Sequence, residues 1–220
     1  MKVALGKSSS NGKVLRKMSL RKRYFDIFLA SLMVLVLFPI LLAIYFWILI
    51  REGRPVFYIS ERMKSPDQAF MMVKFRTMIP ASENSGVSGG DKVDRITPSG
   101  RFLRATRLDE LPQLWNVIKG DISFVGPRPP LREYVVKNPH IYDEVLLSRP
   151  GITGLASLIY SGHEQKILER CKDGAATDAA YQRVCIPRKA QLDLIYQKNQ
   201  SLCFDVAIMV RTGLKVLHRT

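Results

Sequence analysis

The stretch IFLASLMVLVLFPILLAIYFWILI, residues 27–50, decides the fold, because these 24 residues carry no charge. At about 1.5 Å per residue, an α-helix of this length reaches about 36 Å, which exceeds the roughly 30 Å hydrocarbon core of a bilayer. The run ends in Trp47 and the segment REGRP rather than in a small-residue cleavage site. The sequence therefore predicts a retained membrane helix over residues 24–50, and not a signal peptide.

Basic residues flank this helix on both sides. Eight Lys or Arg and no acid stand within residues 1–25, and four more Lys or Arg stand within residues 51–64. Because short segments rich in Lys and Arg stay in the cytoplasm, a straight spanning helix cannot satisfy both flanks. Pro39 lies inside the run and can kink a helix. Two interpretations stay open: a re-entrant helix, which the flanking charge favours, and a spanning helix with a mild kink.

Composition limits the rest of the chain. The 220 residues suffice for one sizeable core, and much of the formal charge of +15 stands in a basic arm, residues 1–23. Such an arm can bind nucleic acid or an anionic membrane, and the adjacent helix favours the membrane. The three cysteines have no CxxC spacing, as is typical of reduced thiols. We therefore predict a cytoplasmic, membrane-associated domain over residues 51–220.

The segment after the membrane helix has the composition of strands. RPVFYISERM and QAFMMVKFRTM are rich in aromatic and β-branched residues and are separated by KSPDQ, which predicts a small β-hairpin. If residues 70–78 are extended, Lys74 and Arg76 share one face, about 6.6 Å apart. Two such cations can bind neighbouring phosphates, or they can simply face water.

The remaining segments favour helices. Residues 80–100 are rich in Ser, Gly and Pro and predict a long loop, whereas residues 164–199 have helical propensity broken by Gly174 and Pro187. Residues 202–219 form an amphipathic pattern that suits the membrane interface or a core position. The predicted fold class is α+β, mostly helical with a small β-hairpin, one N-terminal re-entrant membrane helix and interfacial amphipathic helices.

An acid pair stands in TRLDELPQLWNVIKGD, residues 106–121. Arg101, Arg104 and Arg107 precede it at every third position, so they share one side of a helix and form a candidate anion site. Pro112 is best tolerated in a first helical turn, which places Asp109 and Glu110 beside a helix N-terminus. The pair can cap a helix, or it can serve as a nucleophile and a ligand for magnesium, which prefers carboxylates together with phosphate oxygens.

A rigid arginine follows the acid pair. In GPRPP, residues 126–130, three prolines around Arg128 fix the neighbouring φ angles and hold one guanidinium in place. This side chain can bind a phosphate or brace a carboxylate inside the protein.

Several segments together resemble one known family, the bacterial sugar transferases. The matching pieces are the basic arm and apolar run, KFRTM (74–78), GRFLRATRLDELPQLWNVIKGDISFVGPRP (100–129), RPGITG (149–154) and LDLIYQKNQSLCFD (192–205). Together they cover most of residues 20–217. The resemblance implies a small polyprenyl-phosphate phosphoglycosyl transferase with a helix that re-enters the cytoplasmic face of the bacterial inner membrane.

The resemblance also implies a reaction and its residues. A UDP-sugar gives its sugar-1-phosphate to polyprenyl phosphate, usually undecaprenyl phosphate, with Mg²⁺, and UMP leaves; this is the first membrane step of glycoconjugate or polysaccharide synthesis. Asp109 aligns with the family nucleophile, which forms an aspartyl-phosphosugar intermediate, and Glu110 with its partner in binding metal or managing a proton. The remaining positions that bind phosphate or support the acids are Lys74, Arg76, Arg104, Arg128, Arg149 and Asp193. Membrane lipids are implied partners, nucleic acid is not, and a homo-oligomer stays open.

The sequence departs from the family pattern in places. The family commonly follows PGITG with Trp-Ala-Gln, whereas this chain has Leu155, Ala156 and Ser157, so the sugar stays open. The chain resembles the small form of the family, without the N-terminal membrane domain of larger members. Two other functions are weighed: a membrane-anchored polyanion-binding protein without turnover, and a glycosyltransferase that releases UDP.

Overall fold

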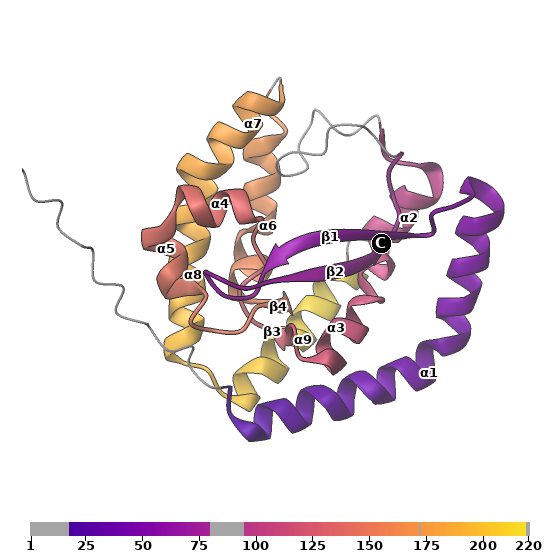
Figure 1. The fold of residues 1–220 in the computed structure, drawn as a ribbon, viewed down its shortest axis with the longest axis horizontal. Helices are drawn as coiled ribbons and strands as arrows, with labels where there is room; N and C mark the ends of the chain where they lie inside the picture. Colours follow the sequence, from indigo (N-terminus) through magenta and orange to yellow (C-terminus); the bar gives the residue numbers. More distant parts are fainter. Residues whose placement is uncertain (1–17, 80–94, 172, 219–220) are drawn as a thin grey trace, which may run out of the picture.

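The computed structural model describes residues 18–79, 95–171 and 173–218 (Figure 1). The predicted α+β class, mostly helical with a small hairpin, is confirmed. The elements are α1 (Leu20–Glu52), β1 (Phe57–Met63), β2 (Ala69–Phe75), α2 (Pro98–Thr106), η2 (Leu108–Glu110), α3 (Gln113–Lys119), β3 (Ser123–Val125), α4 (Arg132–Lys137), α5 (Pro139–Val145), β4 (Gly151–Thr153), α6 (Leu155–Leu168), α7 (Gly174–Ala180), η3 (Tyr181–Cys185), α8 (Ile186–Lys198) and α9 (Leu202–Leu217).

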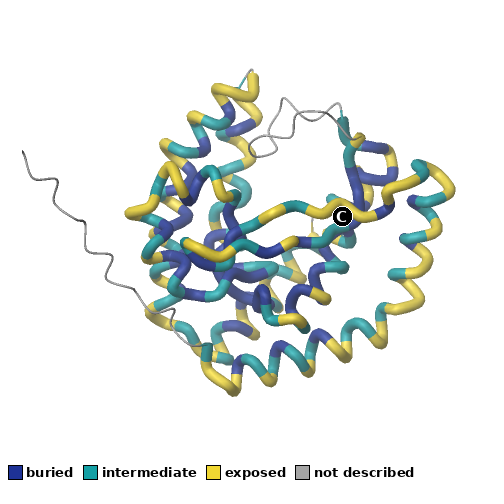
Figure 2. Tube along the Cα trace, in the orientation of Figure 1, coloured by how far each residue is buried: buried dark blue, intermediate teal, exposed yellow. Residues whose placement is uncertain are grey.

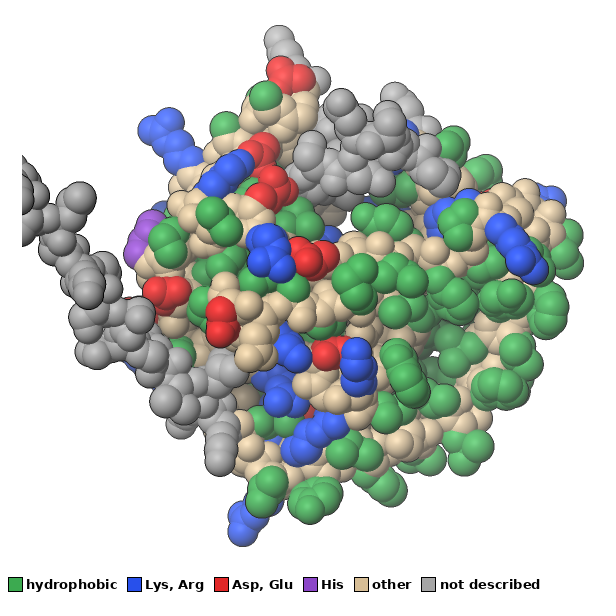
Figure 3. Space-filling view, viewed as in Figure 1, with side chains coloured by type: hydrophobic (Ala, Val, Ile, Leu, Met, Phe, Trp, Pro, Cys, Tyr) green, Lys and Arg blue, Asp and Glu red, His purple; other side chains and the backbone are tan. Residues whose placement is uncertain are grey.

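Helix α1 is the membrane-anchoring element. Of the helices in the described residues it alone is long and apolar enough to cross a membrane, with a mean hydropathy of 3.0 in its most apolar window. It bends as it passes around the domain, and Pro39 stands within it (Figure 1). Figure 2 shows that much of its length is exposed or half-buried, and Figure 3 shows hydrophobic side chains gathered along it. Its outer face is therefore an apolar surface suited to lipid.

The start of α1 lies earlier than the sequence predicts. The helix begins at Leu20 instead of residue 24, because the Ser19 hydroxyl accepts a hydrogen bond from the Lys22 amide and caps it. The end of the predicted basic arm is thus helical, and the rest of that arm, up to residue 17, lies outside the described residues. The predicted loop over residues 80–100 likewise falls mostly outside them, and its last residues open α2 instead.

The hairpin forms as predicted, and a second strand pair accompanies it. Strands β1 and β2 pair antiparallel, with Phe57 opposite Phe75 and Met63 opposite Ala69. Strands β3 and β4 form a short parallel pair that the sequence did not predict. The backbones approach so closely there that a Cβ at Gly126 would overlap the Arg149 carbonyl, and one at Gly154 the Gly126 carbonyl. Glycine at these two positions therefore joins the GPRPP and RPGITG segments.

Both halves of α1 pack on the same domain. Ala30, in the first half, belongs to a buried cluster with side chains of α3, β3 and α9, and the cluster includes Ile208. Ile44 and Ile48, in the second half, pack against Val56 and against side chains of β2 and α2. The helix thus contacts the domain in both of its halves.

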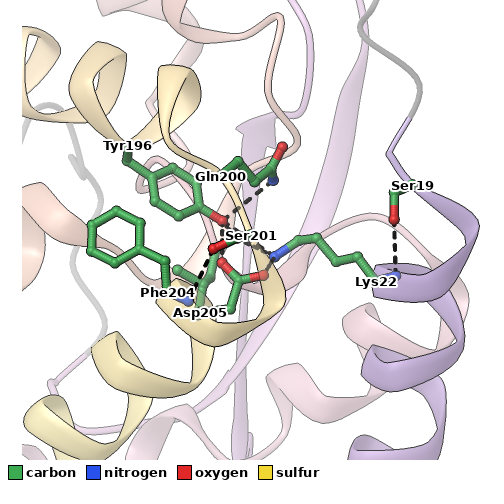
Figure 4. A network of polar contacts seen from close by, with 8 residues as sticks. Ser19, Lys22, Tyr196, Gln200, Ser201, Phe204 and Asp205 are labelled. Carbon is green, nitrogen blue, oxygen red and sulfur yellow. Dashed lines mark hydrogen bonds and ion pairs between the residues drawn. The ribbon is translucent and has the colours of Figure 1, made fainter.

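Polar contacts fix the first end of α1. The Lys22 ammonium is buried, forms an ion pair with Asp205 of α9, and donates to the Tyr196 hydroxyl and the Val125 carbonyl (Figure 4). The Tyr196 hydroxyl in turn donates to Asp205 Oδ1 at 2.6 Å. Next to it, the Arg23 guanidinium donates to the last carbonyls of α3. A buried cation with this many partners is compensated for its loss of hydration.

A buried arginine fixes the other end. The Arg76 guanidinium donates to the carbonyl oxygens of Glu52, Gly53 and Arg54, at 2.8 to 3.2 Å. These carbonyls include the last one of α1, where a cation is favoured by the helix dipole. Arg76 is therefore a structural residue that ties the hairpin to the end of α1.

Candidate active site

The acid pair lies on a short turn between two helices. Helix α2 ends at Thr106, and Arg107 takes the left-handed conformation, with φ of 60°. The chain then forms the 3₁₀ turn Leu108–Glu110, and α3 begins after Pro112. Asp109 and Glu110 are each 8% exposed. The predicted position beside a helix N-terminus is confirmed, but the acids are buried rather than solvated.

Glu110 is surrounded by cations. Its Oε1 atom lies 2.9 Å from Lys74 Nζ, 3.3 Å from Arg128 Nη2 and 3.6 Å from Arg107 Nη1. Burial opposes ionisation, yet the charges of Lys74, Arg128 and Arg107 hold the pKa of Glu110 well below its usual range. The three cations around the turn therefore favour the ionised form of Glu110. In the described residues all three cations contact Glu110 through its Oε1 atom. The Oε2 atom can therefore bind another ligand.

Asp109 has the opposite environment. Its Oδ1 atom is buried and has no hydrogen-bond partner among the described residues. Burial and the charge of Glu110 raise the pKa of Asp109, against the attraction of Lys74, Arg104 and Arg107. A buried carboxylate oxygen without a partner is costly unless a ligand satisfies it. Asp109 is thus the acid of the pair with an oxygen open to a ligand.

The strand pair positions Arg128. Gly126 N donates to the Thr153 carbonyl at 2.9 Å, and Gly151 N donates to the Pro127 carbonyl at 2.8 Å. The two residues immediately before Arg128 are therefore hydrogen-bonded to the β4 segment. The Glu110 charge raises the pKa of Arg128. About 40% of the Arg128 side chain stays exposed. It can therefore hold Glu110 and still reach a ligand.

These residues line one large cavity of about 1700 Å³, more than the roughly 300–1,000 Å³ of an ordinary ligand site. Its charged wall includes Lys74, Arg104 and Arg128 beside the acid pair. Apolar residues from many elements also line it, and α1 and α9 are among the elements that contribute them. These residues include Phe25, Leu29, Met33, Leu114, Phe124, Ile152, Leu158, Val206, Met209 and Val210. Cationic and apolar side chains therefore line the same cavity, which α1 borders.

A second polar group lies on another wall of the cavity. The Lys189 ammonium donates to both oxygens of Glu164, at 3.0 and 3.1 Å, and to the Tyr181 hydroxyl at 3.3 Å. Asp193 follows Lys189 by one turn of α8, and its Oδ1 atom is buried without a partner in the described part of the chain. Burial raises the pKa of Asp193 to about 7, against the attraction of Lys189.

Not all of the predicted site residues contact the acid pair. Arg76 lines the cavity as Lys74 does, but it follows the end of β2 at Phe75, and its guanidinium donates to carbonyls at the end of α1. Arg149 is not among the residues that line the cavity; its guanidinium lies with that of Arg23 beside Gly120. Asp193 lines the cavity, but its charge interactions are with Lys189 rather than with the acid pair.

The arginine stripe is also interrupted. Arg101 and Arg104 lie on α2, but Arg107 follows the end of that helix in a left-handed conformation. Arg104 lines the cavity and attracts Asp109, whereas Arg107 reaches Glu110. Sequence reasoning missed Glu164, Lys189 and Tyr181 as site residues. No local pattern marks them, because they come together only when α6, η3 and α8 pack.

The fold and the cavity define a membrane-anchored α+β protein with a buried acid pair held among cations. The chain matches the family model described as "Bacterial sugar transferase" over residues 15–219. It is 34% identical over 202 residues to the UDP-N-acetylgalactosamine-undecaprenyl-phosphate N-acetylgalactosaminephosphotransferase of Aeromonas hydrophila, which covers 89% of this chain and 43% of that protein.

Two further relatives differ in length. The undecaprenyl-phosphate galactose phosphotransferase of Salmonella typhimurium is 34% identical over 215 residues, covering 90% of this chain and 40% of that protein. The exopolysaccharide production protein ExoY of Sinorhizobium fredii is 31% identical over 207 residues, covering 87% of this chain and 83% of that protein. This chain spans less than half the length of the first two. It belongs to the bacterial sugar transferase family and is membrane-associated through α1.

Proposed function

We propose that this protein transfers sugar-1-phosphate from a UDP-sugar to undecaprenyl phosphate and releases UMP. The observation that carries the proposal is the unequal acid pair, in which Glu110 Oε1 meets three cations and the buried Asp109 Oδ1 meets none in the described residues. The relatives from Aeromonas hydrophila and Salmonella typhimurium, which are named as phosphotransferases acting on undecaprenyl phosphate, support the acceptor and the reaction class.

In the first step, an Asp109 carboxylate oxygen attacks the phosphorus that bears the sugar. The new bond joins Asp109 to that phosphorus, and the bond between the two phosphates breaks, so that UMP leaves with the electron pair. In the second step, an oxygen of the lipid phosphate attacks the same phosphorus and releases the Asp109 carboxylate. A carboxylate is suited to such a covalent role when it is placed beside its target and is not engaged elsewhere.

The cations assist both steps. Lys74, Arg107 and Arg128 are fixed around Glu110 before any substrate arrives. Fixed charges next to a transferring phosphoryl group stabilise the charge that develops on its oxygens. Arg104, which lines the cavity and attracts Asp109, adds a fourth charge. The partial exposure of Arg128 and Arg107 lets each contact Glu110 and the diphosphate together.

The acid pair also fits magnesium. The described residues contain no group of three or more acidic, histidine or cysteine side chains that could hold a metal. Two carboxylate oxygens would bind the ion. One is Asp109 Oδ1, which has no hydrogen-bond partner among the described residues, and the other is Glu110 Oε2, which none of the three cations contacts. Phosphate oxygens of the substrate would supply the other ligands. When bound, the ion would neutralise charge on the diphosphate.

The apolar wall of the cavity supports a lipid acceptor. Side chains of α1 and α9, among them Leu29, Met33 and Val210, line the same cavity as the acid pair, and hydrophobic side chains gather along α1 (Figure 3). A polyprenyl chain can lie along such a surface while its phosphate reaches Asp109. A water-soluble acceptor would leave this wall without a role.

We further infer that α1 re-enters the membrane on the cytoplasmic face of the inner membrane. Its two ends contact one domain, through Lys22 at the start and through Arg76 at the end. Pro39 and the bend of the helix support a return to the same face (Figure 1). The positive flanks of the helix favour the cytoplasmic side.

A turnover assay tests the function. Purified protein is incubated with undecaprenyl phosphate and a panel of UDP-sugars, with and without magnesium, and the nucleotide product is identified. We expect UMP, dependent on magnesium, and no UMP from Asp109→Asn. UDP as the product would indicate an ordinary glycosyltransferase, and binding of the donor without any nucleotide release would indicate a binding protein.

A further inference from the structure

The cavity has a second polar cluster for which the proposed reaction has no role. Glu164 of α6, Tyr181 of η3 and Lys189 of α8 are joined by the three hydrogen bonds of the Lys189 ammonium. All three side chains line the same cavity as Asp109. The side chain of Glu164 retains 22% exposure and that of Lys189 retains 11%, so the pair is accessible from the cavity.

We propose that Glu164 and Lys189 bind neighbouring hydroxyl groups of the hexose of the donor and thereby select the sugar. This proposal rests on the proposed function, because it places a UDP-sugar in the cavity. A carboxylate accepts hydrogen bonds from two adjacent hydroxyls, and an ammonium that exchanges one of its three internal hydrogen bonds donates to a hydroxyl oxygen. Such charge-assisted hydrogen bonds distinguish sugars that differ in the direction of one hydroxyl group.

The position of Arg128 favours the hexose over the other parts of the donor. Arg128 contacts Glu110 and also interacts electrostatically with Glu164, so it is near both the acid pair and the second cluster. In a UDP-sugar the hexose is attached to the phosphorus that Asp109 attacks, whereas the ribose lies beyond the second phosphate. The hexose is therefore the part of the donor, beyond the phosphates, that stays nearest to Asp109 in the cavity that both groups line. A phosphate there would be repelled by Glu164.

Two further observations point to a ligand at this place. Asp193 is 6% exposed, lines the cavity and has Oδ1 without a hydrogen-bond partner in the described residues. A hydroxyl group of a bound sugar would supply the missing donor. In addition, the five residues Tyr181–Cys185 form a π-helical turn, a rare distortion that is frequent at functional sites.

The aromatic side chains complete the cluster. Tyr181 packs against Tyr134 with ring centroids 5.0 Å apart, and the Lys189 ammonium lies 5.1 Å from the centroid of the Tyr181 ring. Both tyrosines line the cavity. Their rings offer an apolar face against which the C–H surface of a hexose can pack. This face lies next to Glu164 and Lys189, which would form hydrogen bonds with the hydroxyl groups of the hexose.

A purely structural ion pair is the alternative, and binding measurements separate the two. Calorimetry is carried out on the Asp109→Asn protein, which cannot turn over, with UDP, UDP-glucose and UDP-galactose as probes. Adding Glu164→Gln is expected to weaken binding of the better UDP-hexose by about tenfold or more, with UDP binding unchanged. The preference between the two hexoses should change as well. Glu144→Gln, on the exposed side of α5, is the matched control and should change neither value.

Each outcome has one meaning for this proposal. Equal weakening of UDP and UDP-hexose would overturn it, since the cluster would then bind ribose or serve only packing. Unchanged affinities, or no UDP-hexose binding at all, would also overturn it. If Glu164→Gln unfolds, Glu164→Gln/Lys189→Met removes both charges together and is measured in the same way. Failure of wild-type protein to release UMP would contradict only the proposed function.

Discussion

Lys74 Nζ lies 2.9 Å from Glu110 Oε1, and this contact separates the roles of two adjacent acids. Because Glu110 draws Lys74, Arg107 and Arg128 to one oxygen, the neighbouring Asp109 has cations near it without being bound by them. A nucleophile needs this combination: positive charge close enough to attract the substrate phosphate, and an oxygen that no side chain occupies.

Replacing Glu110 should therefore impair catalysis strongly. Glu110→Gln removes the charge that fixes the three cations, so we expect kcat to fall by about 10²–10³-fold, the usual effect of losing electrostatic stabilisation of a transition state. Steady-state release of UMP measures this. Glu61→Gln is the control, because it breaks the exposed pair with Arg132, and it should leave kcat within about twofold. Equal losses in both variants would contradict the role given to Glu110.

The stability of the protein should depend on pH through Asp193. Burial raises the pKa of this acid from 3.8 to about 7. Between these two pH values the folded state therefore keeps a proton on Asp193 that the unfolded state has lost. Stability contributed by the protonated form is complete below pH 4 and decreases as pH rises towards about 7. We expect Asp193→Asn to melt at a higher temperature than wild type at pH 8, with a smaller difference at pH 5. Identical melting curves at both pH values would show that Asp193 is not held protonated.

The buried contact between Lys22 and Asp205 should stabilise the attachment of α1 (Figure 4). Lys22→Met leaves Asp205 buried without its cation, and we expect a loss of about 3–5 kcal/mol in unfolding free energy. Lys22→Met/Asp205→Leu removes both charges and should recover much of that loss. Denaturant unfolding in detergent measures both variants. A double variant less stable than Lys22→Met would mean that the ion pair is not the source of the effect.

The two ends of α1 should be accessible from the same side of the membrane. Single cysteines are placed at Arg21, an exposed position in the first turn, and at Gln68, in the turn of the hairpin, with native cysteines replaced by serine. An impermeant maleimide should label both in inverted vesicles and neither in intact cells. Labelling of the two positions from opposite sides would establish a spanning helix.

The sequence predicted the parts of this structure that depend on local patterns. An uncharged run, a hairpin with a proline-containing turn and an acid pair before Pro112 each specify their structure within a few residues of chain. Asp109, Glu110, Lys74, Arg104 and Arg128 accordingly lie around one cavity, as expected.

Long-range packing determined what the sequence did not predict. The contacts of Arg76 with the end of α1 were not predicted, because nothing local reveals that the end of α1 returns to the end of β2 and offers it carbonyl groups. Arg149 belongs to a motif whose glycines and carbonyls position Arg128, while its own side chain lies beside Arg23. Glu164 and Lys189 stand 25 residues apart on separate helices, so only the packed structure brings them into contact.

The most direct test of the account is to look for a covalent intermediate on Asp109. Purified protein is mixed with magnesium and its UDP-sugar in the absence of lipid acceptor, quenched, and analysed by peptide mass spectrometry. We predict one equivalent of UMP released and a sugar-phosphate adduct on Asp109, which disappears when undecaprenyl phosphate is added. UMP release that requires the lipid and leaves no adduct, or an adduct on Glu110, would contradict the account.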